Sequence, residues 1–360
     1  MPKTKATVRG AVLDGPGQIS IREFPRPEAQ IDTAIVEIEL CGICGTDVKL
    51  LGGGEAAPYP LVLGHEGVGR ISAIGSDAAR RYGVAEGDMV IVESSIPCWS
   101  CAQCWSGNYR LCPNKGGYGQ RSPLTNPPGL WGGLADAMYI APGSVVHKVP
   151  DGLNAAAAVG VQILANSVHW LERQGGLRAG DRLLISGCGP QGLVAAIFAR
   201  VIGAAEVVVT GLAADATRLS FAESVGARTV VVGGEQPPEL GSEYDVVLDV
   251  SGSPAAMSGG PALLRPQGTM VVAGRTGGGK TVSFMTDMIS KRELRIQGVL
   301  AKDAGSMAKA ITIAAHDARV ARELAALTTH EYPLVETVEA IQAASKGLAG
   351  FIKSAVRPTL

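Results

Sequence analysis

The sequence carries little charge. Only 18% of its 360 residues are Asp, Glu, Lys or Arg, and the formal net charge is −1, against about 25% charged residues in an average globular domain. Disorder needs low hydrophobicity with a high net charge, so a chain with 46% hydrophobic residues is expected to fold. Without long basic runs the chain lacks the counterion release that drives nucleic-acid binding, so we expect no nucleic-acid partner.

Long apolar runs are also missing. No stretch reaches the roughly 18 uninterrupted apolar residues that indicate a transmembrane helix, and the most apolar region, 153–171, is interrupted by polar residues such as Gln162. The opening residues 1–5 lack the apolar core of a secretory signal. We therefore expect a cytoplasmic protein with no membrane partner.

The length indicates two domains at roughly 150 residues each, both large enough to bury a core. The first 150 residues contain short strand-like segments, among them 34–40, 89–93 and 145–149, separated by Gly and Pro. From about residue 155 apolar strands alternate with helical segments, which is typical of a doubly wound parallel sheet. The expected helices are 155–171, 189–202, 215–225, 306–315 and 335–345, and the expected strands are 183–186, 206–210, 229–232, 245–249, 269–273, 295–299 and 351–356. We expect an α/β protein whose tail returns to the β-rich domain.

A glycine-rich fingerprint lies inside the second, α/β region. The sequence Gly187-Cys188-Gly189-Pro190-Gln191-Gly192 fits G-x-G-x-x-G between an expected strand and an expected helix. In this context the glycines permit a tight turn, the approach of backbone to a pyrophosphate and close packing of helix on strand, while the helix N-terminus favours phosphate. An ordinary glycine turn is the alternative, and the context favours a dinucleotide site.

The acidic residue that usually follows some 20 residues later is missing. The second strand of the α/β region ends at Thr210 and Gly211, which we place at the coenzyme. A carboxylate at Gly211 would bind the ribose 2′-hydroxyl of NAD and repel the 2′-phosphate of NADP. The nearest cation, Arg218, either reaches that phosphate or lies in solvent. The sequence accepts NADP and does not exclude NAD.

Cysteine is present in numbers that indicate metal. There are seven cysteines, and the four at C-x2-C-x2-C-x7-C spacing are Cys98, Cys101, Cys104 and Cys112. In a large chain without an export signal, metal binding is favoured over disulfides. Such close spacing places four thiolates around one tetrahedral zinc, with iron–sulfur ligation or free thiols as alternatives. A closed four-sulfur site leaves no position for substrate, so this zinc is predicted to be structural.

Two further fragments bring thiolate, imidazole and carboxylate together. They are Gly42-Ile43-Cys44-Gly45-Thr46-Asp47 and Gly64-His65-Glu66. With the cysteine lobe, Gly-Gly-Leu-Ala-Asp at 132–136, the fingerprint and Val-Ser-Gly at 250–252, they follow one another at intervals typical of one family. In these motifs the chain resembles, almost end to end, the zinc-containing medium-chain dehydrogenases, the zinc alcohol dehydrogenase family.

The resemblance implies roles for these residues. Cys44 and His65 would be ligands of a catalytic zinc, and Glu66 would lie beside the ion or coordinate it. Thr46 would hydrogen-bond the substrate hydroxyl and begin a proton relay. Asp47 would orient His65 from behind, which fixes the tautomer and geometry of the ligand.

Two positions depart from the family pattern. The fourth ligand position of the family, usually Cys or Glu, is Gln162 here. The amide oxygen of Gln162 is a neutral and weaker ligand, which either coordinates the zinc or lies beside it. Lys49 replaces the His that ends the proton relay in many relatives. It either takes over the end of the relay or is simply a solvated side chain.

The resemblance also implies an architecture. A GroES-like catalytic domain would comprise 1–163 and 300–360, with the structural zinc lobe at 94–115, and a Rossmann dinucleotide-binding domain would comprise 164–299. The cofactors would be two zinc ions per chain, one catalytic and one structural, and NAD(P). The chain would form a homodimer or homotetramer.

The resulting hypothesis is an NAD(P)-dependent zinc alcohol dehydrogenase that acts on a small alcohol or carbonyl compound. A secondary alcohol, polyol or sugar is favoured, because Gln or Glu at the fourth ligand position is similar to some polyol dehydrogenases. One alternative is a zinc-free reductase of enones or other carbonyls from the same superfamily. The others are a catalytically silent nucleotide-binding relative and a zinc-ribbon binding module.

Overall fold

The computed structural model describes residues 6–234, 239–276, 280–346 and 348–360. The opening residues 1–5, on which the absence of a signal was predicted, lie outside the described residues. The chain divides into two compact units, one of Met1–Gln162 with Ile311–Leu360 and one of Ile163–Ala310. Among the described residues, no helix has both the length and the apolar character needed to cross a bilayer.

The second unit is built on a parallel sheet of six strands in the order β13-β12-β11-β14-β15-β16. Its strands are β11 (Arg182–Ser186), β12 (Glu206–Gly211), β13 (Arg228–Val231), β14 (Tyr244–Asp249), β15 (Leu264–Val272) and β16 (Arg295–Gly298). The central strands are rich in Val, Leu and Ile because both of their faces are covered. The predicted parallel sheet is confirmed.

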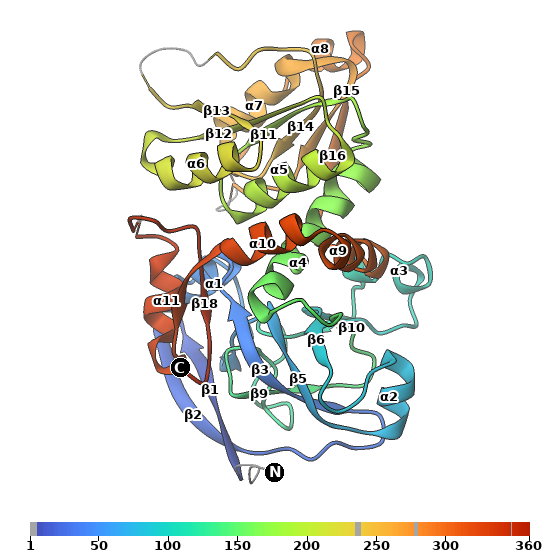
Figure 1. The fold of residues 1–360 in the computed structure, drawn as a ribbon, viewed down its shortest axis with the longest axis vertical. Coiled ribbons are helices and arrows are strands. Elements are labelled where there is room, and N and C mark those ends of the chain that lie inside the picture. The colour runs from blue at the N-terminus through green and yellow to red at the C-terminus, as the bar shows by residue number, and fades with distance from the viewer. Residues whose placement is uncertain (1–5, 235–238, 277–279, 347) are drawn as a thin grey trace. The chain divides into compact units, whose positions relative to one another are not determined.

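Helices cover both faces of this sheet, with α5 and α6 on one side and α7 and α8 on the other (Figure 1). Their bounds are α5 (Pro190–Ile202), η3 (Ala213–Asp215), α6 (Ala216–Ser224), α7 (Pro254–Leu263) and α8 (Thr286–Lys291). The expected helix at 155–171 consists of α4 (Ala155–Ser167) followed by a π-helix, η2 (Val168–Gln174). The doubly wound arrangement predicted from the alternating pattern is therefore present.

The first unit is rich in β-structure. Its largest sheet runs β10-β6-β5-β3-β18-β17, with β9 also paired to β3, and it adds a three-stranded sheet β2-β1-β4 and the pair β7-β8. The strands before the second unit are β1 (Thr7–Gly15), β2 (Gln18–Pro25), β3 (Ala34–Gly42), β4 (Leu61–Val62), β5 (Gly67–Ile74), β6 (Met89–Val92), β7 (Ser95–Ile96), β8 (Gly116–Gly117), β9 (Ala137–Ile140) and β10 (Val146–Lys148). The helices between them are α1 (Gly45–Leu51), α2 (Ser76–Tyr82), α3 (Ala102–Trp105) and η1 (Tyr109–Leu111).

The end of the chain, from Ile311 on, belongs to this first unit. Its elements are α9 (Ala304–His316), α10 (Ala318–Ala326), β17 (Thr328–Tyr332), η4 (Leu334–Glu336), α11 (Thr337–Ala343) and β18 (Lys353–Val356). Strand β18 pairs antiparallel with the end of β3, with Ala355 opposite Gly42 and Val356 opposite Cys41 (Figure 1). The elements α10 and β17 were not predicted, because α10 is interrupted by charges and β17 is mostly polar and only partly buried.

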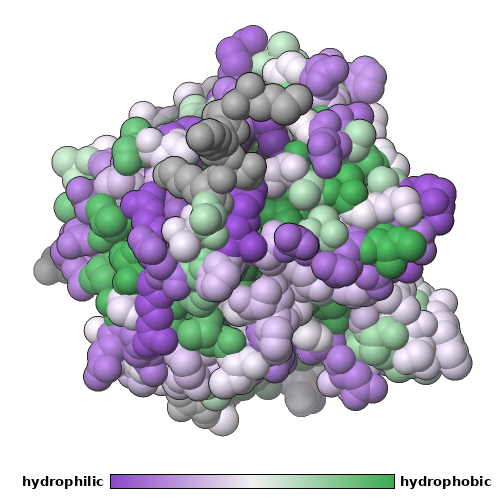
Figure 2. Space-filling model, turned by 90° about the horizontal axis from the view of Figure 1, so that it is seen from below, coloured by the Kyte–Doolittle hydropathy of each residue, from purple (hydrophilic) through white to green (hydrophobic). Residues whose placement is uncertain are grey.

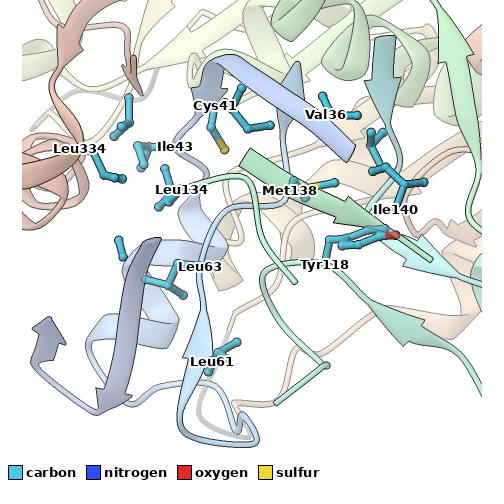
Figure 3. Close-up of a cluster of buried hydrophobic side chains, with 14 of the residues drawn as sticks. Val36, Cys41, Ile43, Leu61, Leu63, Tyr118, Leu134, Met138, Ile140 and Leu334 are labelled. Carbon is cyan, nitrogen blue, oxygen red and sulfur yellow. The ribbon is translucent and has the colours of Figure 1, made fainter. Parts of the chain in front are cut away.

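The core of the first unit gathers behind β3. Figure 3 shows Cys41 among Leu134, Met138 and Leu334, and Cys41 is fully buried in this core. On the face drawn in Figure 2, hydrophilic and hydrophobic residues are interspersed in small groups. The end of β3 is thus a rigid base for the loop that follows it.

Candidate active site

The fragments predicted to bind a catalytic metal meet in the first unit. Cys44 stands at the N-terminus of α1, and His65 and Glu66 immediately precede β5. The Cys44 thiol, a ring nitrogen of His65 and a carboxylate oxygen of Glu66 all lie within 4.8 Å of one another. A thiolate, an imidazole and a carboxylate are ligand types that zinc accepts in catalytic sites.

Asp47 lies directly behind this cluster and is fully buried. Its Oδ2 accepts a hydrogen bond of 2.8 Å from the backbone N–H of Cys44, and its Oδ1 lies 3.4 Å from His65 Nδ1. Burial lowers the pKa of His65, but the negative groups Asp47 and Cys44 raise it and set the net direction upward. Because a field that attracts a proton also attracts a divalent cation, the electrostatics fit a bound Zn²⁺.

Gln162 has the burial expected of a residue at a metal. It is 1% exposed, and neither atom of its amide has a hydrogen-bond partner in the described part of the chain. Val159 lies three residues earlier on the same face of α4. A Cβ built on Gly42 would come 2.8 Å from Val159 and would overlap the Glu66 carboxylate, so both side chains lie beside Gly42. An unsatisfied buried amide costs about 1–3 kcal/mol, which a nearby cation would offset. The donor set therefore fits a zinc ion.

Lys353 is a member of the site that the sequence analysis missed. From β18 its Nζ donates hydrogen bonds of 2.6 Å to Glu66 Oε2 and 2.7 Å to the carbonyl oxygen of Ile43. The Lys353 side chain is buried; burial lowers its pKa, while Glu66 and Cys44 raise it and the net direction is upward. The sequence signal that could have identified Lys353 is that it is the lone charged residue in the expected strand 351–356.

The two proposed relay residues stand on α1. Thr46 Oγ1 is 4.0 Å from Cys44 Sγ, and Thr46 also lines a cavity of about 230 Å³. Lys49, one helical turn further on, is partly buried, and its ammonium makes no ion pair with any residue that the structure describes. The structure thus places Thr46 between the metal cluster and an open cavity.

The four cysteines of the lobe are arranged around a common centre. Their sulfur atoms lie within 4.8 Å of one another, with Cys101 Sγ 3.6 Å from Cys104 Sγ and Cys112 Sγ 3.4 Å from Cys98 Sγ. A tetrahedral site with metal–sulfur bonds of about 2.3 Å has sulfur–sulfur edges of about 3.8 Å. The lobe therefore fits one four-sulfur zinc.

The lobe is anchored to the sheet of the first unit through a buried carboxylate. The Tyr109 hydroxyl donates to Glu93 at 2.9 Å, and His147 Nε2 lies 2.7 Å from the same carboxylate. Trp99 Nε1 donates to the carbonyl oxygen of Gly143 at 2.6 Å. The lobe thus depends on the sheet for its position and on its own thiolates for its shape.

Replacing Cys104 with serine is expected to reduce the zinc content by one ion per chain. The three remaining thiolates do not close a tetrahedron, and the free energy of unfolding should fall by about 3 kcal/mol or more. Metal analysis and urea denaturation measure these effects. Cys188→Ser, which alters a buried cysteine outside the lobe, is the control and should retain its zinc. An unchanged zinc content in the Cys104 variant would contradict the assignment.

The glycine loop of the second unit has the features of a dinucleotide site. Gly187 has a φ of 113°, which only glycine adopts readily, and a side chain at Gly192 would overlap the carbonyl oxygen of Gly187. Gly189 is the N-cap residue of α5, where an added Cβ would meet open space, and Pro190 takes the first helical position. Gln191 Oε1 accepts a hydrogen bond of 3.3 Å from Asn166. The N-terminus of α5 thus lies at the glycine loop, where backbone N–H groups favour a pyrophosphate.

The end of β12 explains why an acid is missing there. A Cβ built on Gly211 comes 2.5 Å from Cys188 Sγ of the glycine loop, so no side chain fits this position. Thr210, next to it, is buried and pairs with Ser186. Arg218 is not a freely solvated arginine, because its guanidinium pairs with Asp215 at 3.0 Å. Asp215 and Arg218 both act on the pKa of Cys188, which burial raises to about 12, so they lie beside the loop.

Comparisons with known proteins agree with this geometry. Residues 30–151 match the model of the alcohol dehydrogenase GroES-like domain, and residues 190–316 match that of zinc-binding dehydrogenases. The chain is 39% identical over 320 residues to a Mycobacterium tuberculosis protein named probable alcohol dehydrogenase, covering 86% of this chain and 87% of that one. It is 30% identical over 350 residues to the sorbitol dehydrogenase of Macaca fascicularis, covering 94% and 92%.

Solved structures give the same result. An alcohol dehydrogenase from Thermotoga maritima superposes with a TM-score of 0.88 at 26% identity, covering 98% of this chain and 99% of that one. A Sinorhizobium meliloti protein described as a zinc-binding dehydrogenase and bound to NADP gives 0.84 at 27% identity, covering 98% and 100%. The chain therefore belongs to the zinc-containing medium-chain dehydrogenase family.

Proposed function

We propose that this protein is a zinc-dependent alcohol dehydrogenase that reversibly transfers hydride between an alcohol and NAD(P)+. The observation that carries the proposal is the convergence of Cys44, His65 and Glu66 within 4.8 Å of one another, in the same unit as a buried Gln162 whose amide has no partner among the described residues. Relatives named sorbitol dehydrogenase and D-xylulose reductase support a secondary alcohol, polyol or sugar as the substrate.

In this proposal Cys44 and His65 hold the catalytic zinc, with Glu66 and Gln162 as the further candidate ligands. Bound zinc supplies a Lewis acid that lowers the pKa of an alcohol. Asp47, whose Oδ1 lies 3.4 Å from His65 Nδ1, would orient the imidazole and favour one tautomer. The Thr46 hydroxyl accepts the hydroxyl proton of the substrate and passes it outward, and Lys49 is the proposed exit toward solvent. A bound nicotinamide would supply the hydride acceptor, so that oxidation of the alcohol would give a carbonyl product, reduced coenzyme and one proton.

The coenzyme is proposed to lie along the glycine loop of the second unit. Gly187, Gly189 and Gly192 and the N-terminus of α5 would receive the pyrophosphate. Thr210 and Gly211 would border the adenosine ribose. Because no carboxylate fits at Gly211 and Arg218 lies beside the loop, we propose that NADP is accepted at least as well as NAD.

Introducing aspartate at Gly211 tests the coenzyme preference. Gly211→Asp alone should weaken the binding of both coenzymes, because its Cβ would lie 2.5 Å from Cys188 Sγ. The double variant Gly211→Asp with Cys188→Ala removes that sulfur, although Leu219 Cδ2, 2.9 Å from the same Cβ, must still move aside. It should favour NADH over NADPH by at least about tenfold, as a carboxylate repels the 2′-phosphate. Fluorescence titration with both coenzymes measures this, and Cys188→Ala alone should keep the parent preference. Tight NADH binding by the single variant would contradict the predicted clash.

A panel of alcohols and carbonyls with NAD and NADP, followed through the absorbance of reduced nicotinamide and combined with metal analysis, tests the activity itself. Alcohol oxidation with two zinc ions per chain is the expected result. Enone or quinone reduction with one zinc or none would favour the zinc-free reductase. Coenzyme binding without turnover would favour a catalytically silent relative. If no coenzyme binds at all, a zinc-ribbon binding module would be favoured.

The proposal includes a cytoplasmic homodimer or homotetramer. Free cysteines, which both candidate zinc sites require as thiolates, suit a reducing compartment. Strand β16 forms an edge of its sheet, and Ile296 and Leu300 are 37% and 49% exposed there, so this edge suits pairing with a second copy. Light scattering coupled to size exclusion measures the assembly.

A further inference from the structure

A cavity of about 230 Å³ in the first unit adjoins the metal cluster. Thr46 lines the cavity, and its hydroxyl oxygen is 4.0 Å from Cys44 Sγ. Glu55, Lys115, Gln120 and Arg121 also line it, so most of its functional groups are polar or charged. A substrate whose hydroxyl reached Thr46 would extend its remaining atoms toward these groups.

Arg121 places a positive charge in the lining of this cavity. Within the described ranges its guanidinium forms no ion pair. Arg121 is exposed, and the aliphatic part of its side chain lies near Gly117, where an added Cβ would come 3.4 Å from Arg121 Cδ. A guanidinium binds carboxylate and phosphate oxygens through two parallel hydrogen bonds.

Lys115 provides a second cation in the same lining. It is partly buried, and its ammonium donates to the carbonyl oxygen of Arg110. Burial lowers the pKa of Lys115, and the charges of Arg121 and Arg110 lower it further, while Cys112 raises it; the net direction is downward, so Arg121 and Lys115 act on one another. An anion placed between Lys115 and Arg121 would relieve that repulsion. With Glu55 as the third charged group, the lining sums to +1, two cations less one carboxylate.

We propose that this cavity binds the far end of a hydroxy substrate that carries an anionic group, either a carboxylate or a phosphate. Arg121 and Lys115 hold that anionic group. This inference rests on the proposed function. The substrate class is thus narrowed from alcohols in general to anionic hydroxy compounds such as hydroxy acids and sugar phosphates. Thr46 contacts the reacting hydroxyl, whereas Arg121 and Lys115 determine specificity.

Matched substrates of equal chain length test the proposal. The carboxylate pair is 4-hydroxybutanoate and 1,4-butanediol, and the phosphate pair is D-sorbitol 6-phosphate and D-sorbitol. In at least one pair the anionic member should have a kcat/KM at least tenfold higher, and the pair concerned identifies the oxyanion. Equal or better kcat/KM for the neutral member of both pairs would overturn the proposal.

Charge-removing variants locate the effect. Arg121→Gln and Lys115→Gln should each lower kcat/KM for the anionic substrate at least tenfold and leave the neutral one within about twofold. Arg322→Gln alters an exposed arginine of the first unit that lines a different cavity, and it should change neither. NADPH affinity of the Arg121 variant should equal that of the parent. If NADPH binding weakens instead, the cations serve the coenzyme and the proposal is wrong.

Calorimetric titration of 4-hydroxybutanoate and D-sorbitol 6-phosphate separates this proposal from the proposed function. If no alcohol is oxidised at all, the dehydrogenase assignment fails. Binding of an anion that Arg121→Gln weakens at least tenfold would still support the oxyanion site. Oxidation of neutral alcohols, with no anion binding that depends on Arg121, would leave the dehydrogenase standing and reject the oxyanion site.

Discussion

Cys44→Ala is expected to lower kcat/KM for alcohol oxidation by at least about a thousandfold, which corresponds to roughly 4 kcal/mol of lost transition-state stabilisation. The variant removes the only thiolate of the cluster that Cys44 forms with His65 and Glu66. Steady-state kinetics measure the loss, and metal analysis should show one zinc per chain instead of two.

The same variant should stay folded. The hydrogen bond that begins α1 runs from the backbone N–H of Cys44 to Asp47 Oδ2, so it does not need the thiol. Circular dichroism and the urea midpoint should therefore remain close to those of the parent. Cys188→Ala is the matched control and should keep both zinc ions and most of the activity. A fully active Cys44→Ala variant would refute the zinc dehydrogenase.

Lys353→Met is expected to lower the free energy of unfolding of the metal-free protein by about 3–5 kcal/mol. The substitution keeps the volume of the stem but leaves Glu66 buried without its cation, and an unpaired buried charge is costly. Urea denaturation of chelator-treated protein measures the loss.

A second substitution separates charge from packing. Lys353→Met combined with Glu66→Gln removes both charges, so it should recover most of the lost stability, whereas two independent losses would simply add. Lys353→Arg keeps the cation and should lie between the parent and Lys353→Met. If the double variant is less stable than Lys353→Met alone, the ion pair is not the cause.

The Lys353–Glu66 pair also explains a glycine in the first motif. A Cβ on Gly42 would overlap Glu66 Oε2 and lie 2.8 Å from Val159 of α4. The end of β3 can therefore accept the Glu66 carboxylate and helix α4 at once only without a side chain. Glycine is required at position 42 because the Glu66 carboxylate and helix α4 both approach the backbone closely there.

The parts of the site that sequence predicted are those made by residues close in the chain. Cys98 to Cys112 lie in one short segment of the chain, and their spacing alone brings four sulfur atoms together. The glycine loop is likewise local, because a strand, a turn and a helix follow one another directly. Family resemblance then joined Cys44 with His65, which spacing by itself does not predict.

The parallel sheet of the second unit could also be predicted from the sequence. Its strands read as short apolar runs because both faces are covered, and hydrophobic pattern alone indicates such runs. The helix α10 and the strand β17 were missed for other reasons. Charged residues interrupt the apolar residues of α10, while β17 is mostly polar and its pairing depends on β18, which comes later in the chain.

By itself, then, the sequence determined the family, the four-cysteine lobe, the glycine loop and the absence of an acid at Gly211. Only the tertiary structure decided that Lys353 meets Glu66 across 287 positions of the chain, that Cys188 fills the space where an acid would stand, and that Lys115 and Arg121 share a cavity with Thr46. The physical reason is that local motifs need only bond geometry and spacing. Contacts between distant residues depend on strand register and packing, which follow from the whole fold.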